Sequence, residues 1–125
     1  MIEEYPDINR AALIIRLKKP FIDWLIFTSK EHDGDDQMTA NDVETEGFDS
    51  KHVYLIPAYD ENEQYDRYLR KHAKEIFEQE LVGWYTDLAM WPQDRSWKVF
   101  KEWFDYEIQT MVFDTVLNQP LEYEG

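Results

Sequence analysis

Apolar and polar residues alternate along two short segments of the chain, and this two-residue period is typical of β-strands. The first segment covers residues 10–18, where one side carries Leu13, Ile15 and Leu17. The second covers residues 53–58 and has Pro57 near its end. We therefore expect two strands, of which the first turns a fully apolar side toward the core.

Two longer segments repeat their apolar residues every three to four positions, as amphipathic helices do. One begins after a cap at Asp60 or Asn62 and runs to about residue 84. The other runs from about residue 96 to residue 116. A shorter apolar stretch, residues 21–28, follows Pro20, a residue that suits the first turn of a helix. This stretch is predicted to be helical, with a strand as the alternative.

The predicted last helix is apolar on two opposite sides. One side carries Trp97, Phe100, Phe104, Ile108, Met111 and Val112, and the other, the predicted aromatic face, carries Val99, Trp103, Tyr106 and Phe113. A helix of this kind must be covered on both sides. The predicted aromatic face is therefore an interaction surface for a protein partner or a second copy, unless residues 21–28 and the turn at 84–92 cover it within one chain.

The order of these elements predicts an α+β fold. At least two strands would form a small sheet, and three main helices would pack on one of its faces. Since two strands make a marginal sheet, we expect either a third strand or a sheet extended by a second subunit. Residues 1–125 are predicted to be a single domain, with a mobile acidic loop at about 33–49 and a loose tail from about residue 118.

The net charge of −14 narrows the range of partners. It repels nucleic acid and anionic membranes, so neither direct nucleic-acid binding nor membrane binding is expected. It suits a basic partner, so an acidic decoy that occupies a nucleic-acid-binding protein is one alternative. The chain contains no cysteine, and its acidic start lacks the features of a signal peptide, so a cytoplasmic location is predicted.

Four basic residues gather on the outer side of the predicted long helix: Arg67, Arg70, Lys71 and Lys74. This basic ridge could hold a phosphate or an acidic peptide. The alternative is that it forms surface ion pairs with Glu63, Glu75 and Glu78, which lie nearby in helical spacing.

Candidate chemistry is sparse. The acidic loop matches several ligand positions of a calcium-binding loop counted from Asp33, but Met38 stands where the sharp turn needs glycine. Glu80 and His72 share the inner side of the long helix, without the spacing of a metal-binding pair. A metal-dependent enzyme that uses these residues and loop carboxylates is a further alternative. No nucleophile motif is present, and we predict no catalytic residue, no metal and no cofactor.

Several short motifs resemble a group of small acidic bacterial proteins of unknown function. They are Asn9-Arg10-Ala11-Ala12-Leu13, Val53-Tyr54-Leu55-Ile56-Pro57, Trp84-Tyr85-Thr86-Asp87, Met90-Trp91-Pro92, the run from Phe100 to Asp105, and Met111-Val112-Phe113-Asp114. The resemblance implies one folded unit and no assigned activity. The sequence thus favours a non-enzymatic protein-interaction module, with a homodimer as one form of it.

Overall fold

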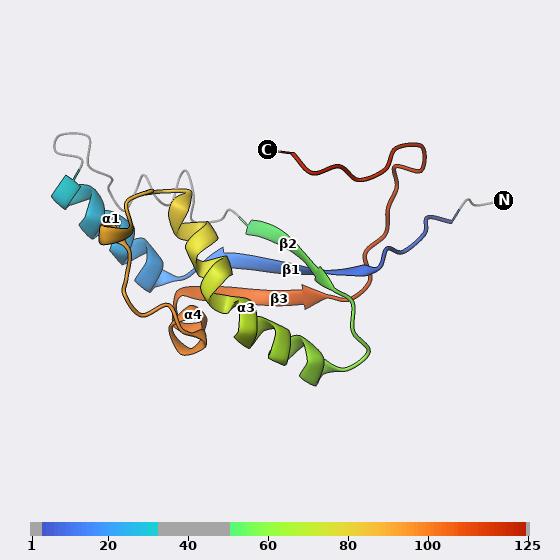
Figure 1. The fold of residues 1–125 in the computed structure, drawn as a ribbon, viewed down its shortest axis with the longest axis horizontal. Coiled ribbons are helices and arrows are strands. Elements are labelled where there is room, and N and C mark those ends of the chain that lie inside the picture. Colours follow the sequence, from blue (N-terminus) through green and yellow to red (C-terminus); the bar gives the residue numbers. More distant parts are fainter. Residues whose placement is uncertain (1–3, 33–50, 125) are drawn as a thin grey trace.

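The computed structural model describes residues 4–32 and 51–124. Their elements follow in the order β1 (Arg10–Leu17), α1 (Lys19–His32), β2 (Lys51–Pro57), α3 (Asn62–Val82), the short 3-10 helix η3 (Leu88–Met90), α4 (Trp97–Trp103) and β3 (Phe104–Gln109) (Figure 1). The predicted acidic loop, with its calcium-loop residues, lies outside the described residues.

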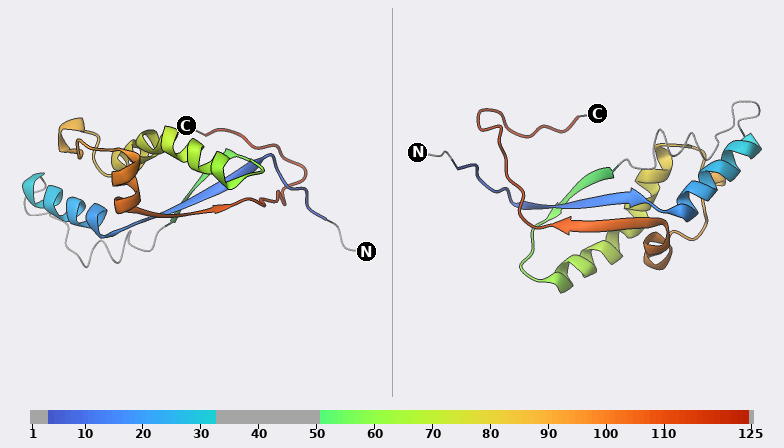
Figure 2. Two further views of the ribbon diagram at one scale, coloured as in Figure 1. Left: turned by 90° about the horizontal axis from the view of Figure 1, so that it is seen from below. Right: turned by 180° about the vertical axis from the view of Figure 1, so that it is seen from behind.

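The three strands form one antiparallel sheet in the order β2-β1-β3. β1 is the central strand, and both of its edges are paired. This position suits its apolar side chains, most of which are buried there. Figure 2 shows α3 and α4 on one side of this sheet. The predicted α+β class, with three helices and a small sheet, is therefore confirmed, and the helix predicted over residues 21–28 lies within α1.

The core lies between the sheet and the helices. Every second residue of β1 faces it, and large side chains from α1, α3, α4 and β3 meet them there. The core includes Ala11, Leu13, Ile15, Leu17, Phe21, Leu25, Leu69, Phe77, Phe100 and Phe104. Aromatic rings pack edge to face or tilted at its centre, as between Phe77 and Phe104 at 5.1 Å between ring centroids.

The single helix predicted over residues 96–116 is wrong. Ser96 caps α4, whose last residue is Trp103, and β3 follows at once. Residues 104–109 alternate apolar and polar, so they fit a strand as well as they fit a helix spacing. Pairing with the second edge of β1 completes the sheet and decides between the two, which supplies the third strand within one chain.

The long helix was predicted with nearly the right bounds but with the wrong cap. Glu61, between the two predicted residues, precedes its first turn, and the Glu61 backbone N–H donates to the Gln64 side chain. The predicted turn before Pro92 is η3, where the Asp87 carboxylate accepts from the Ala89 N–H at 2.9 Å.

Candidate interaction surface

The sheet has one face that turns away from the helices. Antiparallel register places its residues in three rows across β2, β1 and β3. The rows are Leu55–Ala12–Gln109, Val53–Ile14–Glu107 and Lys51–Arg16–Asp105. We call these nine residues the open face. Two of its apolar side chains remain largely accessible, since Val53 is 61% exposed and Leu55 is 50% exposed.

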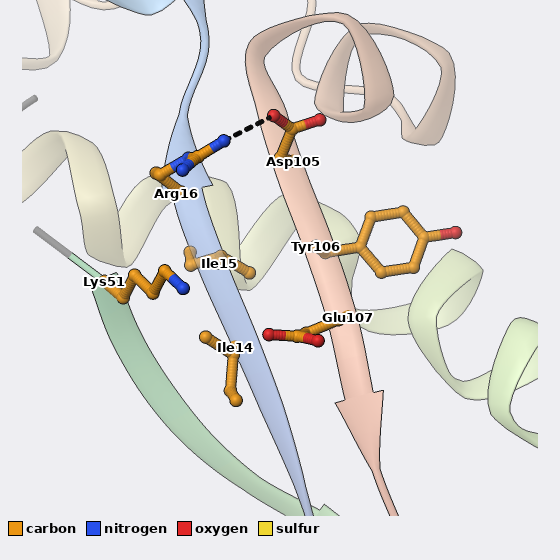
Figure 3. Close-up of a pocket in the computed structure, with 7 residues that line it drawn as sticks. All are labelled: Ile14, Ile15, Arg16, Lys51, Asp105, Tyr106 and Glu107. Carbon is orange, nitrogen blue, oxygen red and sulfur yellow. Dashed lines mark ion pairs between the residues drawn. The ribbon is translucent and has the colours of Figure 1, made fainter. Parts of the chain in front are cut away.

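One end of the open face is hollowed into a groove of about 240 Å³. Ile14 forms its floor, while Lys51 of β2 and Glu107 of β3 extend over β1 from opposite sides (Figure 3). Arg16 and Asp105 close the groove with an ion pair at 3.5 Å. Both of these side chains are about half exposed, so the pair contributes at most about 1 kcal/mol and can be rearranged by a partner.

A second apolar surface follows β3. Residues 110–124, the C-terminal arm, leave the sheet beside the N-terminal segment and then turn back away from it (Figure 1). Backbone hydrogen bonds tie its start to that segment: the Ile8 N–H donates to the Val112 carbonyl at 2.8 Å, and the Asp114 N–H donates to the Pro6 carbonyl at 2.9 Å. Six large apolar side chains of the arm are at least half exposed: Met111, Phe113, Val116, Leu117, Leu121 and Tyr123.

The predicted aromatic face is not one surface. Trp103 packs against Phe21 and Phe77, with ring centroids 5.7 and 5.3 Å apart, so α1 and α3 partly cover it within the chain. Tyr106 lies on β3 and contacts Trp97, and Val99 is partly buried on α4. Phe113 lies apart from them, in the C-terminal arm opposite Asp7. The face is dispersed because the helix that would have aligned these residues ends at Trp103.

The basic ridge lies on the exposed side of α3, as predicted, but its predicted ion pairs are absent within the described part of the chain. Glu75 instead bonds His72 at 2.9 Å, and Glu78 bonds Arg95 at 3.3 Å. Among the described residues, Arg67, Arg70, Lys71 and Lys74 form no ion pair. Glu63, the third predicted partner, lines a hollow with Arg67 and Arg70 without forming an ion pair there.

A buried polar cluster joins β2 to α3, and sequence patterns gave little sign of it. The Glu80 side chain is only 4% exposed and bonds the His52 Nδ1 at 2.7 Å. It also accepts a hydrogen bond from the Tyr54 hydroxyl. Burial, this hydrogen bond and the charge of Glu80 raise the pKa of Tyr54. The one available signal was a carboxylate on an apolar helix side, and that pattern does not identify His52 as its partner.

The cluster resembles the orienting half of a catalytic or metal-binding histidine, since a carboxylate fixes one ring nitrogen. Among residues 4–32 and 51–124, however, no group of three or more histidine and carboxylate side chains is placed to hold a metal ion. We interpret the cluster as a satisfied buried charge that fastens the edge strand β2 to α3.

No protein-family model matches the sequence, and comparisons with curated proteins and with solved structures found no significant match. None of the described helices is long and apolar enough to cross a membrane. Function is therefore inferred from the residues and surfaces described above.

Proposed function

We propose that this protein is an interaction module that pairs with a second copy of its own chain. In the pair, the C-terminal arm of each copy lies on the open face of the other. One observation carries this proposal: the same chain presents a sheet face and an extended arm, and each of them has large apolar side chains that are at least half exposed. Contiguous exposed apolar surface of this kind usually marks an interface.

The chemistry of the two surfaces supports their pairing. The arm contains Asp114, Glu122 and Glu124 and no lysine or arginine. The open face offers apolar side chains beside Lys51 and Arg16, whose charges balance those of Asp105 and Glu107 on a protein that is otherwise strongly acidic. An apolar, acidic segment therefore fits this face better than it fits most of the molecule's surface.

A second copy is the natural occupant because each chain supplies both halves of the contact. Under twofold symmetry every arm-to-face contact occurs twice, so one modest contact is doubled in the dimer. Stable interfaces typically use about 20–30 residues on each partner, and the arm and the open face together offer residues 110–124 and nine residues of the sheet.

The test is the mass in solution of two variants. Val53→Thr/Leu55→Thr removes apolar surface from the open face and keeps strand propensity, and truncation after Asp114 removes most of the arm but keeps its anchoring hydrogen bonds. We expect the natural chain to be a dimer in light scattering and sedimentation, and each variant to weaken dimerisation at least about tenfold. Phe27→Thr/Leu88→Thr, which alters two apolar residues elsewhere that are at least as exposed, should leave the dimer intact.

Mixing the two variants sharpens the test. The face variant keeps an intact arm and the truncated chain keeps an intact face, so their mixture should form a heterodimer with one of the two contacts. The proposal is overturned if the natural chain stays monomeric up to about 0.3 mM, because its association would then be weaker than about −5 kcal/mol. Equal weakening by the Phe27/Leu88 control would overturn it as well.

A further inference from the structure

A separate cavity lies beside the first half of α3, away from the sheet. Its volume is about 320 Å³, and we call it the tyrosine pocket. Five of its six lining residues lie on one side of α3 over two to three turns, and the sixth comes from the loop before the helix. The lining consists of Tyr59, Gln64, Arg67, Tyr68, Lys71 and His72.

The pocket contains two cations with no ion-pair partner among the described residues. Arg67 and Lys71 are four residues apart on α3, so they are neighbours on the helix surface and repel each other. An anion that contacts both side chains would relieve this repulsion and gain charge-assisted hydrogen bonds. Arg67 also lines a neighbouring hollow with Glu63, Asp66 and Arg70, whereas Lys71 lines the tyrosine pocket and not that hollow.

Aromatic rings form the wall of the pocket. Tyr59 lies 6.3 Å from Tyr68, and Tyr68 lies 4.2 Å from His72, between ring centroids. The Tyr65 hydroxyl accepts from the Tyr59 N–H at 2.8 Å and donates to the Tyr59 carbonyl at 3.1 Å. These bonds fix the loop that carries Tyr59, so the wall is formed before any ligand arrives. Flat ring systems stack on such walls, and Arg67 can add a cation–π contact.

We infer that the tyrosine pocket binds a small aromatic phosphate of the size of a nucleoside monophosphate. The cations would contact the phosphate, the tyrosine rings would stack on the aromatic ring, and the Gln64 amide could hydrogen-bond its edge. A volume of about 320 Å³ is at the lower end for ligand pockets, which favours a mononucleotide over a larger ligand. The inference is independent of self-association, because no lining residue belongs to the open face or to the arm.

The pocket is tested by titrating the full chain with three probes, AMP, inorganic phosphate and adenosine, and measuring binding by calorimetry. We expect AMP to bind, and each of the other two to bind at least about tenfold more weakly, since each lacks one half of the recognised chemistry. Tyr68→Leu should weaken AMP binding about tenfold and change phosphate binding less than about twofold.

The basic ridge supplies a matched control. Arg67→Ala/Lys71→Ala and Arg70→Ala/Lys74→Ala remove the same charge from the same helix, but only the first pair lines the pocket. The first should weaken AMP binding at least about tenfold, and the second less than about threefold. Equal losses in the two variants would show diffuse attraction in place of a pocket and overturn the inference. No AMP binding at millimolar concentration would overturn it directly.

Discussion

Glu80 shows how a buried charge can be tolerated in a small acidic protein. A carboxylate removed from water loses several kcal/mol of solvation unless it finds donors. Here His52 and Tyr54, both from β2, donate to it. No buried polar side-chain atom in the described part of the chain lacks a partner, so the cluster leaves no unpaired group behind. Its physical effect is to couple an edge strand to the longest helix.

The Tyr54→Phe variant should have a distinctive pH profile. Because the folded-state pKa of Tyr54 is raised above its unfolded value, the tyrosine's contribution to stability is complete below about pH 10. That contribution is then lost as the pH rises toward the raised pKa, since only the unfolded chain ionises easily. At neutral pH the variant should lose about 1–2 kcal/mol, because Glu80 keeps one donor fewer.

Denaturant unfolding between pH 7 and pH 11 measures both effects. The natural chain should lose stability above about pH 10 more steeply than Tyr54→Phe does. Tyr123→Phe, which changes a fully exposed tyrosine, should follow the natural chain throughout. Parallel curves of stability against pH for all three proteins would contradict the raised pKa of Tyr54. The pKa of Tyr106 is also raised by burial and by Asp66, but Tyr106 is present in all three proteins, so its contribution cancels when their curves are compared.

At the level of elements, the secondary structure could be predicted from the sequence where the apolar residues of a segment recur with only one period. β1, β2 and α3 each have a single apolar repeat, and each was located to within a few residues. The stretch at 21–28 is apolar nearly all round and left a strand as the alternative, and the helix that forms there, α1, extends to His32. Residues 97–109 carry two repeats at once: Trp97, Phe100 and Phe104 fit a helix, while Phe104, Tyr106 and Ile108 fit a strand. The unpaired edge of β1 decides between them, and that edge is a tertiary feature.

The candidate surfaces also differ in how far the sequence predicts them. The exposed side of β1 follows from its alternation, but an open face of three rows requires β3, whose residues were predicted to be helical. The basic ridge follows from helical spacing alone. The bond between His52 and Glu80 joins residues 28 apart in sequence with no local pattern, so it depends on how β2 packs against α3.

Two glutamates, five residues apart, test the boundary between α4 and β3. Glu102 is exposed on α4, and Glu107 is exposed on β3 opposite Ile14. Threonine favours strands and disfavours helices by a few tenths of a kcal/mol. Glu107→Thr should therefore raise the free energy of unfolding by about 0.5 kcal/mol, and Glu102→Thr should lower it by a similar amount. Denaturant unfolding would detect the difference in sign, whereas a continuous helix would lose stability from both changes.

At the scale of the whole molecule, charge opposes the proposed dimer. Each copy carries −14, so two copies repel each other wherever salt does not screen them. The few contacts between acidic arm residues and Lys51 or Arg16 would be exposed pairs, worth about 0–1 kcal/mol each. Apolar contact must therefore supply most of the association free energy, and the repulsion between whole molecules should determine how that free energy responds to salt.

Raising the salt from about 20 mM to 500 mM shortens the screening length from more than 20 Å to less than 5 Å. We therefore expect the dimer's Kd, measured by sedimentation velocity, to fall as salt rises, while Val53→Thr/Leu55→Thr stays the weaker dimer at every salt concentration. A chain that captures a basic partner shows the opposite response, since that affinity falls as charges are screened. Self-association that weakens with salt would mean that ion pairs, and not the apolar arm and open face, hold the two copies together.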